Sequence, residues 1–157
     1  MNRLAIISCG AKKKDYACAA SEMYNEGVLF NTMHDYVKSD YEDYRILSGN
    51  YGVLHPDDII EPYGDVVFFV QKIFRDRAKK EGRTIKAVPR SEQDAWARMV
   101  KDQIDWDHYD VVDFYINIYY WNALKPYFGS NPDKFVFHKF KRRLGPNIKM
   151  FKEKIKR

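Results

Sequence analysis

The chain has 157 residues and a formal net charge of +5, and 45% of its residues are hydrophobic. This composition is typical of a single globular domain spanning 1–157, and it excludes a disordered or fibrous protein. No apolar stretch approaches the ~20 residues of a membrane span, and the apolar run before Ser8 is too short for a secretory signal. Because Cys9 and Cys18 are too few for a disulfide framework, we expect a cytoplasmic protein with no membrane partner.

The charge is divided unevenly along the chain. Residues 1–64 contain 6 Lys/Arg against 10 Asp/Glu, whereas residues 65–157 contain 21 against 12. Two segments are strongly basic: 72–90 has eight basic residues and two acidic ones, and 139–157 has nine and one. Clustered positive charge attracts a polyanion by releasing its counterions, so the pattern favours a nucleic-acid partner, DNA rather than RNA. The alternative interpretation is a solvated surface that keeps the protein soluble.

The first half of the chain predicts two strands and a helix. The apolar run at 3–9 indicates a buried strand, and 44–48 indicates a second. Between them, apolar spacing over 21–39 predicts a helix, although Gly27 weakens it. Residues 49–64 form a long predicted loop rich in Gly, Pro, Asn and Asp, and loops of this length are uncommon unless they are functional.

The second half continues the alternation of strands and helices. We predict a helix within 66–81, whose start is equally consistent with a strand, then a clear helix at 91–104 and a strand at 111–117. A helix follows at 119–128, ended or bent by Pro126, then a strand at 134–138 and a basic amphipathic helix at 144–157. This order predicts a three-layer α/β domain, in which a mostly parallel four-stranded sheet has helices on both faces. Residues 65–90 are interpreted as a basic insertion.

Polar residues follow every predicted strand. In sheets of this kind, ligands bind outside the carboxyl ends of the strands, so we expect these residues to share one cavity. The catalytic candidates are Asp57, His55, Cys9 and Ser48. An acid such as Asp57 can activate water or stabilise a developing cation; alternatively, Asp57, Asp58 and Glu61 only form turns. As a nucleophile Cys9 must be a thiolate, which Lys12 or Lys13 would favour; alternatively, it is a buried structural thiol.

Other strand-end residues are suited to binding. Gly10, Lys12 and Lys13 resemble an anion cradle, although solvated lysines are the simpler alternative. Tyr51 and Tyr63 either pack in the fold or stack on an extruded base, which is worth ~1–3 kcal/mol. The remaining substrate-binding candidates are Asn117 and Tyr119, and the nucleic-acid-binding candidates are Lys139, Lys141, Arg142 and Arg143. The four His and two Cys lack the spacing of metal ligands, and no nucleotide-cofactor motif is present, so neither a metal nor a cofactor is expected.

Two segments together resemble a largely uncharacterised family of small bacterial and phage proteins. One is the Ser-Cys-Gly-x-Lys-Lys opening at 8–13, and the other is the Ile-Leu-Ser-x-x-Tyr-Gly-x-Leu-x-Pro-Asp-x-x-Ile-x-Pro-Tyr block at 46–63. That family is distantly similar to the modification core of archaeosine synthase, and through it to the uracil-DNA-glycosylase-like α/β fold. The resemblance therefore implies that fold and a nucleobase as the substrate.

The sequence also departs from these relatives. Gly49-Asn50 replaces the Ala-Lys of the family, and the region 117–120 replaces an expected glycine. Cys9 and Lys13 match the opening of archaeosine synthase, but Lys14-Asp15 does not match its Pro-Tyr, and neither Cys18 nor Ser21 matches its later Ser and His. Lysine-transfer chemistry is therefore not implied. The water-activating Gly-Gln-Asp-Pro-Tyr motif of uracil-DNA glycosylases is also absent.

Three functions are consistent with the sequence. The first is an enzyme that acts on a nucleobase, favoured to be a modified one, or on its N-glycosidic bond in DNA, after extruding the base. The second is a non-catalytic nucleic-acid binder, such as an accessory protein of a phage or of bacterial defence. The third is an N-glycosidase or deoxyribosyltransferase-like enzyme that acts on free nucleotides. Because a fold does not fix a function, the choice depends on the site.

Overall fold

A five-stranded sheet forms the centre of the computed structural model, which describes residues 1–69, 71–140 and 144–155. The strand order is β4-β3-β1-β8-β9, and all neighbours are parallel except the antiparallel pair β3–β4. The strands are β1 (Arg3–Ser8), β3 (Asp43–Ser48), β4 (Gly52–Leu54), β8 (Val111–Tyr115) and β9 (Phe135–Phe137).

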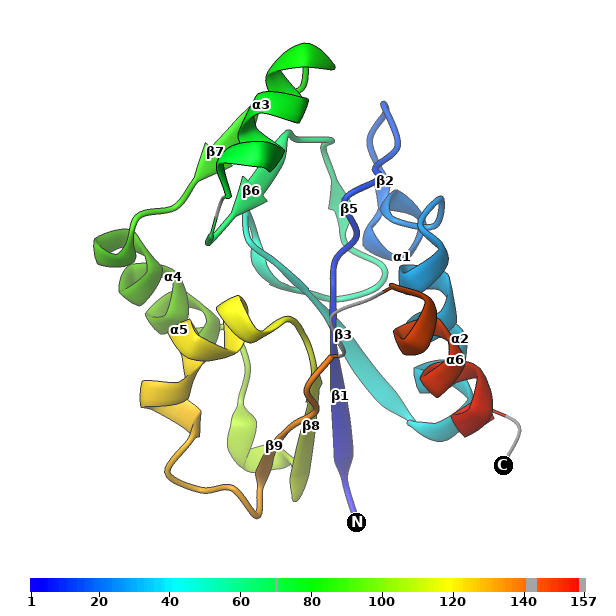
Figure 1. Ribbon diagram of the computed structural model, residues 1–157. Helices are drawn as coiled ribbons and strands as arrows, with labels where there is room; N and C mark the ends of the chain where they lie inside the picture. Colours follow the sequence, from blue (N-terminus) through cyan, green and yellow to red (C-terminus); the bar gives the residue numbers. More distant parts are fainter. Residues whose placement is uncertain (70, 141–143, 156–157) are drawn as a thin grey trace.

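Helices cover both faces of this sheet (Figure 1). The central strand β1 explains why, because Ala5 and Ile7 are buried against one layer and Leu4 and Ile6 against the other. One layer contains α1 (Ala20–Met23), α2 (Val28–Asp40) and α6 (Leu144–Ile155), and the other contains α4 (Arg90–Asp102) and α5 (Ile118–Phe128), with the 3-10 turn η1 (Trp106–His108). No helix in the described ranges is both long and apolar enough to cross a bilayer.

The α/β class with helices on both faces of the sheet is confirmed, but the number of strands is wrong. The four predicted strands are present and parallel, and the fifth strand, β4, lies inside the segment predicted as a loop. Gly52 adopts a positive φ of 74° at the turn into β4, so the chain folds back at once along β3. The same segment contains β5 (Ile59–Ile60), which pairs with β2 (Cys18–Ala19).

Two predicted helices have different bounds. The helix predicted at 21–39 is divided into α1 and α2, with a turn at 24–27 where Gly27 precedes α2. Pro126 does not end the predicted helix, since α5 continues through it to Phe128. The predicted C-terminal helix is present as α6 over Leu144–Ile155, and residues 156–157 lie outside the described residues.

The segment 65–90 forms a small unit beside the main sheet (Figure 1). It consists of β6 (Asp65–Val67), α3 (Lys72–Lys80) and β7 (Ile85–Ala87), and its two strands pair in parallel. The helix predicted within 66–81 is present as α3, and its start, which the sequence left open between helix and strand, is strand β6. Strand β7 was missed because only one of its three residues is even half-buried.

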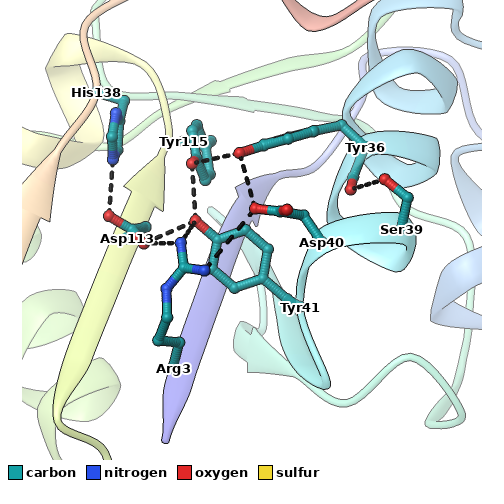
Figure 2. A network of polar contacts seen from close by, with 8 residues as sticks. All are labelled: Arg3, Tyr36, Ser39, Asp40, Tyr41, Asp113, Tyr115 and His138. Carbon is teal, nitrogen blue, oxygen red and sulfur yellow. Dashed lines mark hydrogen bonds and ion pairs between the residues drawn. The ribbon is translucent and has the colours of Figure 1, made fainter. Parts of the chain in front are cut away.

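A buried carboxylate joins three strands to helix α2 (Figure 2). The Asp113 carboxylate on β8 accepts a hydrogen bond of 2.7 Å from the Tyr41 hydroxyl, and it lies 2.8 Å from His138 Nε2 and 3.4 Å from the Arg3 guanidinium. The ring of His138 also stacks on Tyr115. This network therefore fixes the relative positions of β1, β8, β9 and α2.

Candidate active site

A pocket of about 430 Å³ opens beyond the carboxyl ends of β1 and β3, where the small β6–α3–β7 unit faces the main sheet. Its volume lies in the range of small-molecule sites. The end of β1 contributes Cys9, Gly10, Ala11 and Lys13, and the end of β3 contributes Gly49. The other lining residues are Tyr63, Asp65, Val66, Val67, Phe69, Phe74, Arg77, Arg83, Ile85 and Tyr120.

The charged groups of the pocket are three cations and one carboxylate. Asp65 lies between two of the cations, 2.9 Å from Arg83 and 3.6 Å from the Lys13 ammonium. The Lys13 side chain is only 9% exposed, and its ammonium lies 4.8 Å from the centre of the Tyr63 ring. Arg77, on α3, lines the same wall. The pocket therefore has a net positive charge and is suited to an anion.

A row of hydroxyl groups lies behind this charged wall. The Tyr63 hydroxyl is 2.5 Å from that of Tyr24 and 2.8 Å from Ser48 Oγ. Ser48 Oγ accepts hydrogen bonds from the backbone N–H groups of Asn50 and Tyr51. Its own hydroxyl proton therefore remains to be donated to the Tyr63 hydroxyl. Burial, with a smaller contribution from Cys9, raises the pKa of Tyr63 above its ordinary value, so this hydroxyl is neutral at pH 7.

Cys9 and Tyr120 form the floor of the pocket. The Cys9 thiol is half-buried, and its Sγ lies 3.7 Å from the Tyr120 hydroxyl. Burial, followed by the influence of Cys9, raises the pKa of Tyr120, so it too is a neutral donor. A Cβ at Gly49 would lie 2.9 Å from the Tyr120 oxygen and 3.2 Å from Val66, so a glycine is required for this close approach.

Several residues that the sequence predicted for the site lie together in the pocket. Cys9, Gly10, Lys13 and Tyr63 all line the pocket. Other predicted residues lie just outside the lining. Ser48 is fully buried behind Tyr63, and Tyr51 packs edge-on against the Tyr63 ring at 5.4 Å. Asn117 accepts a hydrogen bond from the Tyr120 backbone at the start of α5, and Tyr119 stacks on Phe69.

Other predicted residues do not reach this pocket. Asp57 and His55 lie together on an exposed turn, where the Asp57 side chain is 89% exposed and the Asp57 backbone N–H donates to His55 Nδ1. In the same turn, Asp58 accepts a hydrogen bond from the His55 backbone, as expected of a turn-forming residue. Lys12 and Lys139 are exposed, and Lys141, Arg142 and Arg143 lie outside the described residues.

The pocket also contains residues that sequence reasoning missed. Asp65, Arg77, Arg83 and Phe74 come from the segment treated as a basic insertion, and Tyr120 comes from the helix after β8. One signal was available, because Asp65 lies two residues after the Pro-Tyr that ends the second motif. The described residues contain no cluster of three or more His, Cys, Asp or Glu that could hold a metal ion.

Comparison with known proteins places the chain in a family. It is 36% identical over 73 residues to the uncharacterized protein YfjM of Bacillus subtilis (strain 168), a match that covers 43% of this chain and 49% of YfjM. The aligned region therefore spans about half the length of that relative. A family of unknown function, DUF6884, matches residues 4–153, which include every described residue that lines the pocket. The chain therefore belongs to the DUF6884 family.

Proposed function

We propose that the protein is a nucleic-acid-directed enzyme that binds a nucleotide, favoured to carry a modified base, in the pocket and hydrolyses its N-glycosidic bond. The observation that carries this proposal is the meeting of three kinds of groups in one cavity: phosphate-binding cations, exposed aromatic rings and a single lining carboxylate. The expected distant similarity to uracil-DNA glycosylases is a further reason for choosing this reaction, which we propose takes place on DNA in the cytoplasm.

Each part of a nucleotide has a matching set of groups in the pocket. Lys13, Arg77 and Arg83 supply positive charge for a phosphate, of which Asp65 balances only a part. Phe74 and Phe69 are exposed apolar rings at the wall and suit the faces of a base. The neutral hydroxyl of Tyr120 can donate a hydrogen bond to the edge of that base.

The proposed reaction needs one negative charge beside the sugar. As the C1′–N bond breaks, its electron pair leaves with the base, and the sugar becomes a cation that the Asp65 carboxylate stabilises. A water molecule then adds to C1′ and loses a proton, and the departing base gains one. Tyr120 stabilises the charge on the leaving base, and Cys9 contacts its edge. We assign the carboxylate role to Asp65 because Asp57 lies on an exposed turn.

A free nucleotide is the second candidate substrate. It is favoured by the position of the cations, since Lys13, Arg77 and Arg83 lie within the pocket itself rather than on a surrounding surface. A terminal phosphate would then be held by the same wall, and the basic C-terminal segment would be dispensable. The chemistry at C1′ is the same in both cases.

Base release tests the proposal directly. The protein is incubated with single-stranded and duplex oligonucleotides that carry modified or unmodified bases, and with the corresponding free nucleotides. Abasic sites are detected by alkaline cleavage and free bases by mass spectrometry. We expect at least one substrate to lose its base, and Lys13→Met to lower the rate at least about tenfold, because Lys13 lines the pocket.

Lys12→Met is the matched control, since Lys12 is the exposed neighbour of Lys13 and does not line the pocket. Its rate should equal that of the wild type. Nucleic-acid binding without release of any base would contradict catalysis and would favour the non-catalytic binder.

A further inference from the structure

We propose that a second cavity beside the pocket binds the nucleotide that flanks the one undergoing reaction. This inference rests on the proposed function and specifies its substrate as a polynucleotide strand rather than a free nucleotide. The cavity has a volume of about 490 Å³ and lies between the residues that follow β6 and the first turns of α4 and α5. Its lining includes Phe69, Arg90, Gln93, Tyr119 and Asn122.

The two cavities are adjacent because Phe69 lines both of them. The ring of Phe69 is stacked on that of Tyr119, with centroids 5.1 Å apart and planes within 10°. Both side chains are unusually exposed for large aromatic residues, at 54% and 43%. Exposed, parallel rings form a surface on which a base can stack. This pair therefore offers a stacking surface at the boundary between the two cavities.

The aromatic pair rests on a fixed support. Phe68, which also lines the second cavity, packs edge-on against Trp96 at 4.6 Å and against Tyr120 at 4.9 Å. The Gln93 amide nitrogen donates to the carbonyls of Phe68 and Val88, and so holds the backbone next to Phe69. A pre-positioned surface binds a base with little loss of conformational entropy.

Polar groups of the second cavity suit the rest of a nucleotide. Arg90 is exposed and forms no ion pair with any residue that the structure describes, so its charge is available to a phosphate. The carboxylate of Asp94, also in the lining, is already paired with Arg98 at 2.5 Å. Asn122 is an exposed amide that can exchange hydrogen bonds with a base edge. The cavity therefore offers one available cation, an aromatic surface and an amide.

A continuous strand is the occupant that this arrangement fits best. Neighbouring nucleotides of one strand are covalently joined, and here two cavities of about 430 and 490 Å³ share one wall. A free nucleotide would occupy only the first cavity, against Phe69, and would leave the Tyr119 ring in water. Extruding a base for reaction also separates it from its neighbours in the stack, and the rings can replace one lost stacking partner.

Binding measurements test this subsite. The affinities of the four deoxynucleoside 5′-monophosphates and the four matching 5′-phosphorylated homodinucleotides are measured by calorimetry with the full chain. We expect the best dinucleotide to bind about tenfold more tightly than its mononucleotide, as one additional stacked base allows. In Tyr119→Ala, and separately in Arg90→Ala, this ratio should fall to about two or less.

Tyr16→Ala is the matched control, because Tyr16 is also an exposed tyrosine, at 57%, and lines neither cavity. It should retain the tenfold ratio. A mononucleotide that binds with no gain from the second nucleotide, or a gain that persists in both variants, would overturn the subsite while leaving the pocket intact. If neither mononucleotides nor dinucleotides bind, the subsite is overturned, and the base-release assay, which includes modified bases, decides the proposed function separately.

Discussion

Replacing Asp65 with asparagine is expected to strengthen nucleotide binding and to slow turnover. The substitution removes the negative charge between Lys13 and Arg83, so nucleotide phosphate should bind about tenfold more tightly. The same substitution removes the carboxylate that stabilises the sugar cation, so base release should slow at least about 100-fold. Calorimetry measures the first effect, and single-turnover kinetics at saturating substrate measures the second.

Asp57→Asn is the matched control for Asp65→Asn. Asp57 is the carboxylate that the sequence favoured, but it is exposed on its turn and lies outside the pocket lining. We expect neither affinity nor turnover to change in Asp57→Asn. If Asp57→Asn lost turnover while Asp65→Asn stayed active, the catalytic carboxylate would be Asp57, and the assignment to Asp65 would be contradicted.

Asp113→Ala is expected to lower the free energy of unfolding by about 1–3 kcal/mol, because it removes the buried acceptor to which the Tyr41 hydroxyl donates. The substitution leaves the Tyr41 hydroxyl, His138 and the Arg3 guanidinium without their common partner. Urea denaturation at pH 7 measures the loss. Asp107→Ala serves as a control, because Asp107 is a fully exposed carboxylate 3.9 Å from Lys134, and its denaturation midpoint should not change.

The contribution of Asp113 to the free energy of unfolding should also depend on pH. Burial raises the pKa of Asp113, but hydrogen bonds from His138 and Tyr41 and the charges of His138 and Arg3 outweigh it, so the pKa lies below its ordinary 3.8. The unfolded chain therefore binds the proton more readily, and the stabilisation is present above pH 3.8 and is lost as the pH falls through the native pKa. A destabilisation that is equally large in strong acid would contradict this account of the network.

Much of the sheet could be predicted from sequence because its central strands are buried on both faces. The continuous apolar runs that end at Ser8 and Ser48 form neighbouring parallel strands, so the residues after them meet at one edge. Because of that geometry, Cys9, Gly10, Lys13 and Tyr63 could be expected at one cavity from the sequence, and all four line the pocket. Runs of consecutive apolar residues were a sufficient signal there.

The position of Asp57 could not be predicted in the same way. The residues after β3 turn back at Gly52 into β4, which carries the following Pro-Asp-Asp turn away from the pocket lining. Strand β4 has three residues and pairs with β3 as a tight hairpin, so its signal in the sequence is a short turn ending at Gly52 and not an apolar run. A loop rich in Gly, Pro and Asp therefore indicated a bend but not its direction.

The wall formed by Asp65, Arg77 and Arg83 was missed for a related reason. Strands β6 and β7 have three residues each and pair across the intervening helix α3, so neither has a recognisable pattern of its own. The charge of this segment was visible in the sequence, but its position opposite the end of β1 is set by packing. An apparent insertion thus supplies half of the candidate site.

Protection of the Cys9 thiol by a nucleotide tests most directly whether the pocket is the binding site. The two cysteines provide an internal comparison, since Cys9 is half-buried in the pocket lining and Cys18 is buried outside it. Alkylation by iodoacetamide is followed at each cysteine by peptide mass spectrometry, with and without an oligonucleotide or nucleotide shown by calorimetry to bind. We predict that ligand above about ten times its Kd slows alkylation of Cys9 about tenfold and leaves Cys18 unchanged. An unchanged rate at Cys9 with the ligand bound would place the ligand elsewhere and contradict the proposed function.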